Sequence, residues 1–175
     1  MGDNTLVGFF YKHGKTCVFW DVNDYPIPDG LDPSSIYQSI KDAIKKHGCD
    51  AEVTIHAYAD DNTVSDDLRR QLLDAGFKFE VFSPGGDHAR HCTMYCDMVL
   101  WAFKHPTPPL NLIVLAKVFD CEGDFYTFMC ALRISYHAVL FSEKKQIWPG
   151  APLFTSIFDG GRNNISGSSL NVSGS

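Results

Sequence analysis

Acidic residues at three separate places in this chain could hold a metal ion together. Asp21 follows the apolar run 16–20, which has the character of a buried strand, and a proline-stiffened loop comes directly after it. Glu122 and Asp124 follow a second apolar run, and Asp97 lies in a stretch with helical periodicity. Carboxylate oxygens are ligands that suit Mg²⁺ and Mn²⁺, and such ions can activate water for phosphodiester cleavage. The chemistry that these residue types indicate is metal-dependent hydrolysis.

Each of these acids also has a purely structural interpretation. Asp21 could cap the turn that follows it, and Asp124 could act only as a helix N-cap. Asp97 could pair with a nearby basic side chain, the candidates being Lys104, Arg90 and Lys117. Taken singly, each alternative is at least as good as a catalytic role. Taken jointly, the structural alternatives weaken, because three acids with unrelated capping or pairing roles would have to lie at the same place by chance.

A second group of ligand types forms a rival site. His88, Cys92 and Cys96 recur every four residues on one face of a predicted helix. Two of them could share a zinc ion, but three span about 12 Å, too far for one ion. The chain also has no CxxC pair among its six cysteines. We therefore favour core cysteines and surface histidines over a zinc site, and we expect reduced thiols in an intracellular protein.

Strands and helices are predicted to alternate along the chain. Strands are expected at 16–22, 51–59, 77–82, 110–116 and 137–141, with helices from Asp32-Pro33 to Gly48, from Ser65 to Gly76, over about 87–104 and over about 124–133. This alternation predicts an α/β fold with a doubly wound, mostly parallel sheet. Asp21 and Asp124 would follow the first and fourth strands. If those strands are neighbours, both acids face the same crevice at the carboxyl edge of the sheet.

Composition limits the classes of function. With 175 residues, 45% of them hydrophobic, the chain fits one globular domain with a full core. It has no apolar run long enough to cross a membrane and no signal-peptide pattern, so we expect an intracellular protein, cytoplasmic by default. A net charge of −6 argues against a nucleic-acid coat protein but not against a nuclease, whose carboxylates are balanced by bound cations.

Three short motifs, in order, resemble those of the NYN domain family. The run FWDVNDYPIP at residues 19–28 is similar to the family motif FWDxENxxxP, and DMVLWA at 97–102 is similar to the DMxLWA helix of its limkain-type branch, named for meiosis regulator and mRNA stability factor proteins. The run EGDF at 122–125, with Phe128 and Leu132-Arg133 after it, resembles the motif GDxDF and its helix. The likeness covers about residues 14–145, which we expect to form the domain. Residues 146–175 would be a C-terminal extension, flexible from about 160.

The resemblance implies a fold, a site and an activity. It implies a PIN-like three-layer sandwich with strand order 3-2-1-4-5, and a metal-dependent endoribonuclease that acts on single-stranded RNA. By position, Asp21, Asp97 and Asp124 would hold Mg²⁺ or Mn²⁺, with Glu122 or Asp24 assisting. We expect further contacts to the RNA from a small polar and basic set: Asn23, Lys15, Lys117 and Arg133. Family members are linked to RNA regulation and in some cases to peroxisomes, and a protein partner or a second copy of the chain is compatible with this.

The chain departs from the family pattern at three points. The family's acid after the first Asp is Asn23 here, with Asp24 next to it. Where the branch has an acidic KDAADK-like stretch, this chain has HARHC at 88–92, with Asp87 as the nearby acid. The loop before Glu122 is longer than the family's. These departures favour an alternative function, an NYN domain with weakened catalysis that serves as an RNA- or protein-binding module.

Overall fold

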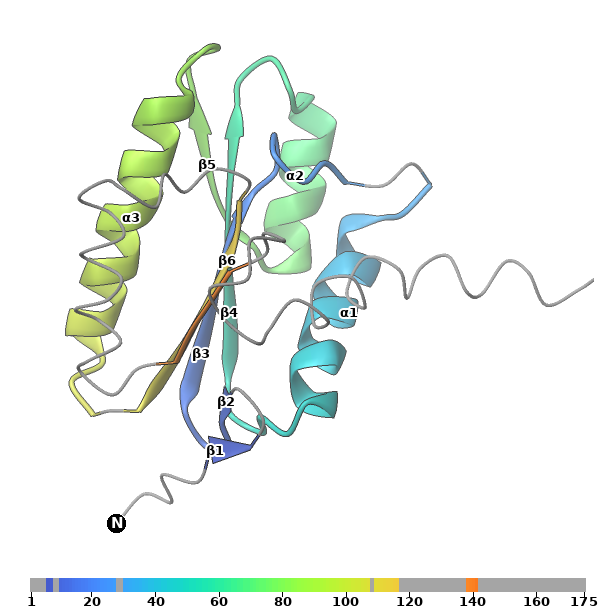
Figure 1. The fold of residues 1–175 in the computed structure, drawn as a ribbon. Helices are drawn as coiled ribbons and strands as arrows, with labels where there is room; N and C mark the ends of the chain where they lie inside the picture. The colour runs from blue at the N-terminus through green and yellow to red at the C-terminus, as the bar shows by residue number, and fades with distance from the viewer. Residues whose placement is uncertain (1–5, 8–9, 28–29, 108, 117–137, 142–175) are drawn as a thin grey trace, which may run out of the picture.

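The computed structural model describes residues 6–7, 10–27, 30–107, 109–116 and 138–141. Within these ranges the fold is a parallel five-stranded sheet with helices on both faces (Figure 1). A short antiparallel pair, β1 (Leu6–Val7) and β2 (Phe10–Tyr11), precedes the sheet. The sequence did not predict this pair, because two-residue strands carry too little periodicity to be recognised.

The sheet has the predicted strand order. Its strands are β3 (Lys15–Asp21), β4 (Val53–Asp60), β5 (Lys78–Phe82), β6 (Leu110–Leu115) and β7 (Ala138–Phe141). They pair in the order β5-β4-β3-β6-β7, and each pair is parallel. The predicted order 3-2-1-4-5 is therefore confirmed. It places β3 in the centre, between β4 and β6, with Asp21 at its carboxyl end.

In the described ranges three helices cover the sheet, and their ends agree with the capping signals in the sequence. The fourth predicted helix, over about 124–133, lies outside the described residues. Helix α1 (Pro33–Lys46) begins after Asp32, whose carboxylate accepts a hydrogen bond from the backbone N–H of Ser35 at 3.0 Å. Helix α2 (Asp66–Ala75) begins after Ser65 and ends at Gly76, whose φ of 102° suits glycine. Helix α3 (Asp87–Lys104) has the predicted bounds.

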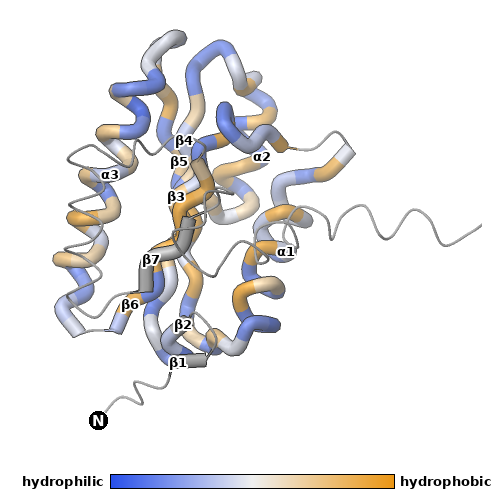
Figure 2. Tube along the Cα trace, viewed as in Figure 1, coloured by the Kyte–Doolittle hydropathy of each residue, from blue (hydrophilic) through white to orange (hydrophobic). Residues whose placement is uncertain are grey.

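Alternate residues of β3 enter two separate cores. Val18 and Trp20 pack on the face that α1 and α2 cover, whereas Cys17 and Phe19 pack on the face that α3 covers. Figure 2 shows hydrophobic residues along the central strands, while the helices carry both hydrophilic and hydrophobic residues. Because every residue of β3 after Lys15 is buried, the strand holds its last residue, Asp21, in a fixed position.

A buried asparagine joins the segment before β3 to the neighbouring strand. The side chain of Asn111, on β6, accepts a hydrogen bond from the backbone N–H of Tyr11 at 2.8 Å. It also donates to the backbone oxygens of Tyr11 and Gly14 and to Thr16 Oγ1, at 2.9, 3.0 and 3.1 Å. A Cβ atom on Gly14 would lie only 3.0 Å from this amide, so a larger residue there would require the amide to shift. Among the described residues, no helix has the length and apolar character that crossing a membrane requires.

Candidate functional site

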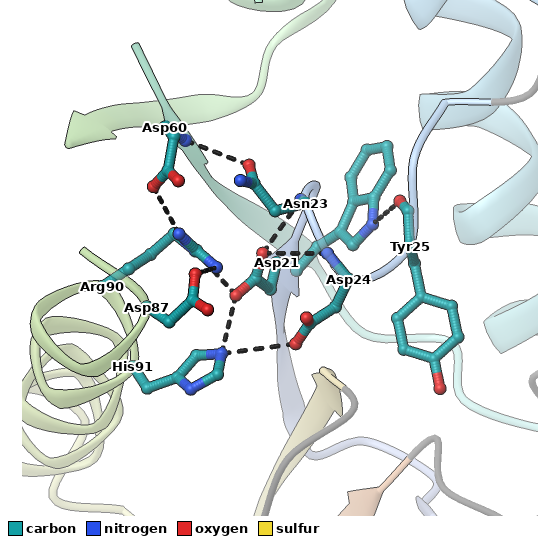
Figure 3. Close-up of polar contacts among 9 residues, drawn as sticks. Asp21, Asn23, Asp24, Tyr25, Asp60, Asp87, Arg90 and His91 are labelled. Carbon is teal, nitrogen blue, oxygen red and sulfur yellow. Dashed lines mark hydrogen bonds and ion pairs between the residues drawn. The ribbon is translucent and has the colours of Figure 1, made fainter. Parts of the chain in front are cut away.

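The candidate site is built around Asp21, at the carboxyl end of the central strand. Its side chain is fully buried. Its Oδ1 accepts hydrogen bonds from the backbone N–H groups of Asn23 and Asp24, at 2.9 and 3.2 Å. On the opposite face of the sheet, Trp20 Nε1 donates to the backbone oxygen of Tyr25 at 2.9 Å (Figure 3). The loop that carries Asp24 is therefore held from both faces of β3, and the turn-capping role considered for Asp21 is confirmed.

Two basic side chains from α3 occupy the other oxygen of Asp21. Its Oδ2 accepts from Arg90 Nε and from His91 Nε2, both at 2.8 Å. With the two backbone donors on Oδ1, this makes four donors on one carboxylate. A carboxylate offers about four lone-pair positions, so every acceptor position of Asp21 is in use.

Arg90 is the centre of a buried ion-pair network. Its side chain is 1% exposed. It contacts three carboxylates, because Nη1 donates to Asp60 and Nη2 donates to Asp87 at 2.8 Å, in addition to the bond from Nε to Asp21. Burial by itself would lower the pKa of Arg90, but the hydrogen bonds and the charge of Asp21 raise it overall. Arg90 therefore carries its positive charge permanently at the place where a cation bound to Asp21 would lie.

His91 adds a second positive charge. Its Nε2 also lies 3.3 Å from Asp24 Oδ2, so one N–H is shared between two carboxylates. The hydrogen bonds to Asp21 and Asp24 raise the pKa of His91 to about 9, against the opposing effect of burial. At neutral pH the imidazole is therefore protonated and acts as a donor.

Negative charge is in excess at this edge of the sheet. Asp21, Asp60 and Asp24 have side chains that are 0, 8 and 16% exposed, and Asp87 is mostly solvated. Three shielded carboxylates against Arg90 and protonated His91 leave one negative charge. If His91 loses its proton, the surplus becomes two, which is the charge that a divalent cation balances.

The donor atoms fit a divalent cation, on one condition. Asp21, Asp24 and His91 each offer a ligand atom, and these atoms lie within 4.8 Å of one another. Carboxylate and imidazole together suit ions such as Mn²⁺. Because His91 must be neutral to act as a ligand and Oδ2 of Asp21 is already occupied, a metal ion has to displace the proton of His91 and the contact from Arg90.

Comparison with known families identifies the domain. A family model described as the NYN domain matches residues 15–147 of the chain. The chain belongs to the NYN family. The strand order and the acidic carboxyl edge agree with the PIN-like nuclease fold of this family. Among curated proteins, none matches the chain significantly.

Asp97 does not join Asp21 in the described part of this NYN domain. It lies on α3 six residues beyond His91, about 9 Å farther along the helix axis. Its Oδ2 accepts a hydrogen bond from the hydroxyl of Tyr58, on β4, at 2.9 Å. Burial raises the pKa of Tyr58, and the negative charge of Asp97 raises it further, so the hydroxyl remains neutral and acts as a donor. Asp97 does share a helix face with buried Met94 and Trp101, as the periodicity indicated.

The other predicted residues fall in three places. Asp24 and Asn23 lie at the site, where Asn23 Oδ1 accepts from the backbone N–H of Asp60 at 3.0 Å. Lys15 lies at the first residue of β3, at the opposite edge of the sheet. Four lie outside the described residues: Lys117, Glu122, Asp124 and Arg133.

Sequence reasoning missed the roles of Asp60, Arg90 and His91. Asp60 ends the strand beside β3, so the rule that parallel strands end at one edge would have found it, had the second strand been extended by one residue. The sequence predicted Arg90 only as a possible partner of Asp97, and it included His91 only in the HARHC run that departs from the family pattern. In the HARHC segment, the available signal was the pair Arg90-His91, which follows Asp87 by about one helical turn.

The rival cysteine group does not form a metal site in the described residues. Cys92 Sγ lies 3.5 Å from His88 Nε2. The prediction that these cysteines belong to the core is wrong, because Cys92 and Cys96 are both exposed. They lie on the side of α3 that faces away from the sheet, whereas Cys17 and Cys49 are buried. Burial raises the pKa of Cys17 well above its usual value, which makes that thiol unreactive.

Proposed function

We propose that this NYN domain is a metal-dependent endoribonuclease that cleaves single-stranded RNA, in RNA turnover or in the regulation of gene expression. The observation that carries the proposal is the surplus of shielded carboxylate charge at the carboxyl edge of the parallel sheet. A domain gains nothing in stability from gathering three such groups unless cations balance them. The three motifs further favour the limkain-type branch of the family.

The chain's own residues define the roles. Asp21 is the fixed ligand, because two backbone donors hold its Oδ1 in place and leave Oδ2 to face the site. Asp24 supplies a second oxygen from the loop that Trp20 holds. We propose Glu122 and Asp124 as further ligands that follow β6, the neighbour of β3. We leave Asp97 out of the set because its carboxylate bonds Tyr58. A divalent ion at this place would supply Lewis acidity for the attack of water on phosphorus.

A cleavage assay tests this proposal. Labelled single-stranded RNA is incubated with the domain in Mn²⁺, in Mg²⁺ or in EDTA, using wild type, Asp21→Asn and the control Asp42→Asn. Asp42 is an exposed acid on α1, and within the described residues its hydrogen-bond partner is Gln38 of the same helix. We expect cleavage to need the ion, to fall by about 100-fold in Asp21→Asn and to be unchanged in the control. Cleavage that survives both EDTA and Asp21→Asn would show that the site is wrong.

A second function, RNA binding without cleavage, is favoured by Arg90. Its guanidinium already satisfies Asp21, Asp60 and Asp87, so the site is stable without an ion. Under this function the domain retains RNA binding in EDTA, and neither Mn²⁺ nor Mg²⁺ supports turnover. An Arg90→Met variant that gains cleavage in Mn²⁺ would assign the loss of turnover to this one side chain.

A further inference from the structure

A cavity at the opposite edge of the sheet has the character of an anion site. It has a volume of about 300 Å³ and lies between the end of α3 and the first residues of the strands. Lys15 and Lys78 are the first residues of β3 and β5, and Lys104 is the last residue of α3. All three side chains line the cavity and are exposed at its rim.

The charge in this cavity is not balanced locally. Three lysines face two carboxylates, Glu52 and Asp97, and Asp97 already accepts a hydrogen bond from Tyr58. Among the described residues, none of the three lysines forms an ion pair. The net charge of the chain is −6, so three lysines without ion pairs around one cavity make the local charge positive where the chain as a whole is negative.

A histidine that lines the cavity has a buried ring nitrogen without a partner among the described residues. His56, on β4, lines the cavity, and its Nε2 is buried with no hydrogen-bond partner in the described residues. Its ring packs against Phe19, with centroids 5.3 Å apart. Burial, and after it the charge of Lys78, lowers the pKa of His56 to about 4, so the ring is neutral and can offer one N–H. Buried polar atoms are nearly always bonded, so this nitrogen indicates a ligand or an ordered water.

We propose that this cavity binds a phosphate group, with Lys15, Lys78 and Lys104 neutralising its charge and His56 Nε2 donating a hydrogen bond to one oxygen. Lysine ammonium groups bind phosphate as point charges. The site is separate from the Asp21 site, because six residue steps along β3 span roughly 20 Å. It therefore goes beyond the proposed cleavage and does not depend on it. The phosphate can belong to an RNA strand or to a free anion.

Two matched double variants test the site. Lys78→Ala/Lys104→Ala removes two charges from the cavity, and Lys45→Ala/Lys46→Ala removes two exposed charges from the last turn of α1. All measurements are made in EDTA, so an inactive nuclease site does not affect them. Inorganic phosphate and a short oligouridylate are titrated separately. The imidazole signals of His56 are followed by NMR, and RNA affinity is measured by fluorescence anisotropy against salt.

We expect phosphate to shift the His56 signals of wild type and of the α1 variant at similar concentrations. In the cavity variant the same shift should need a phosphate concentration at least roughly fivefold higher. If RNA shifts the same signals, the phosphate is that of a strand, and the cavity variant should lose about 0.7 from the salt slope for each lost contact. If only inorganic phosphate shifts them, the site takes a free anion. Absence of a shift with both probes, or equal behaviour of the two double variants, would overturn the proposal.

Discussion

Replacing Arg90 with methionine is the most informative single change in this domain. Methionine keeps most of the length of the side chain but removes the charge and all donors. It leaves Asp21 and Asp60 buried without their main counter-charge, since His91 is then the one described cationic side chain that still contacts Asp21. Breaking a buried ion pair by removing one partner costs about 3–5 kcal/mol. A domain of this size is stable by about 5–15 kcal/mol in all, so the loss is a large share of the total.

Urea unfolding in EDTA measures this loss. Arg70→Met is the matched control, because Arg70 pairs with Asp67 three residues earlier, as Arg90 pairs with Asp87, but its side chain is 71% exposed. An exposed pair contributes about 0–1 kcal/mol. We expect Arg90→Met to lower the free energy of unfolding by several times the change in Arg70→Met. If the two variants differ by less than about 1 kcal/mol, Arg90 is not buried among carboxylates as described.

The same variant tests whether a metal ion and Arg90 compete for Asp21. Without Arg90, Oδ2 of Asp21 is open on one side, so a divalent ion should bind more tightly. An ion at 100 times its dissociation constant stabilises the folded state by about 2.7 kcal/mol. Mn²⁺ should therefore stabilise Arg90→Met more than wild type. Equal stabilisation of the two proteins by Mn²⁺ would refute the competition.

Three further changes test separate parts of the structure. Tyr58→Phe removes the donor to Asp97 and should lower the free energy of unfolding by about 1.5–3 kcal/mol, whereas a loss under about 0.5 kcal/mol in urea melts would show that the bond contributes little. The pKa of His91 is raised to about 9, so protonated His91 stabilises the fold fully below about pH 6.5 and loses this effect as the pH rises through about 9. The difference in unfolding free energy between wild type and His91→Gln should therefore shrink across that window. A difference that grows with pH would contradict the assignment. Asp32→Ala removes the cap on the N–H of Ser35 and should lower the midpoint of urea unfolding; an unchanged midpoint would show that this cap does not stabilise the helix.

The fold was predictable because local signals agree with the tertiary structure. The caps at Asp32 and Ser65 and the glycine at Gly76 mark helix ends that packing does not override. The almost unbroken apolar run of β6 indicated a strand buried on both faces, and the strand lies beside β3. The strand order came from the motif resemblance, since periodicity alone does not say which strands are neighbours.

The site was predictable only in part, because its partners are distant in sequence. Asp21 was found from its position after a buried strand. Arg90 could not be assigned to it, because an arginine on a helix has no pattern that names a carboxylate 69 residues away. The sequence also placed Asp97 at the site. Spacing along α3 indicates the helix face on which Asp97 lies, but it does not indicate how far along the helix axis Asp97 lies from Asp21. Its true neighbour, Tyr58, depends on the parallel register that pairs Tyr58 with Asp21.

The direction of the helices gives the domain an electrical polarity. Helices α1 and α3 run opposite to the parallel strands and end in lysines, Lys45-Lys46 and Lys104, at the edge where β3 and β5 begin with Lys15 and Lys78. Four aspartates, Asp21, Asp24, Asp60 and Asp87, lie together at the other edge. A polyanion approaching through dilute salt would therefore meet this acidic molecule in one preferred orientation, lysine edge first, and the preference would fade within a Debye length of about 8 Å at physiological ionic strength. This asymmetry of charge should affect the rate at which a polyanion associates with the domain more than the final affinity.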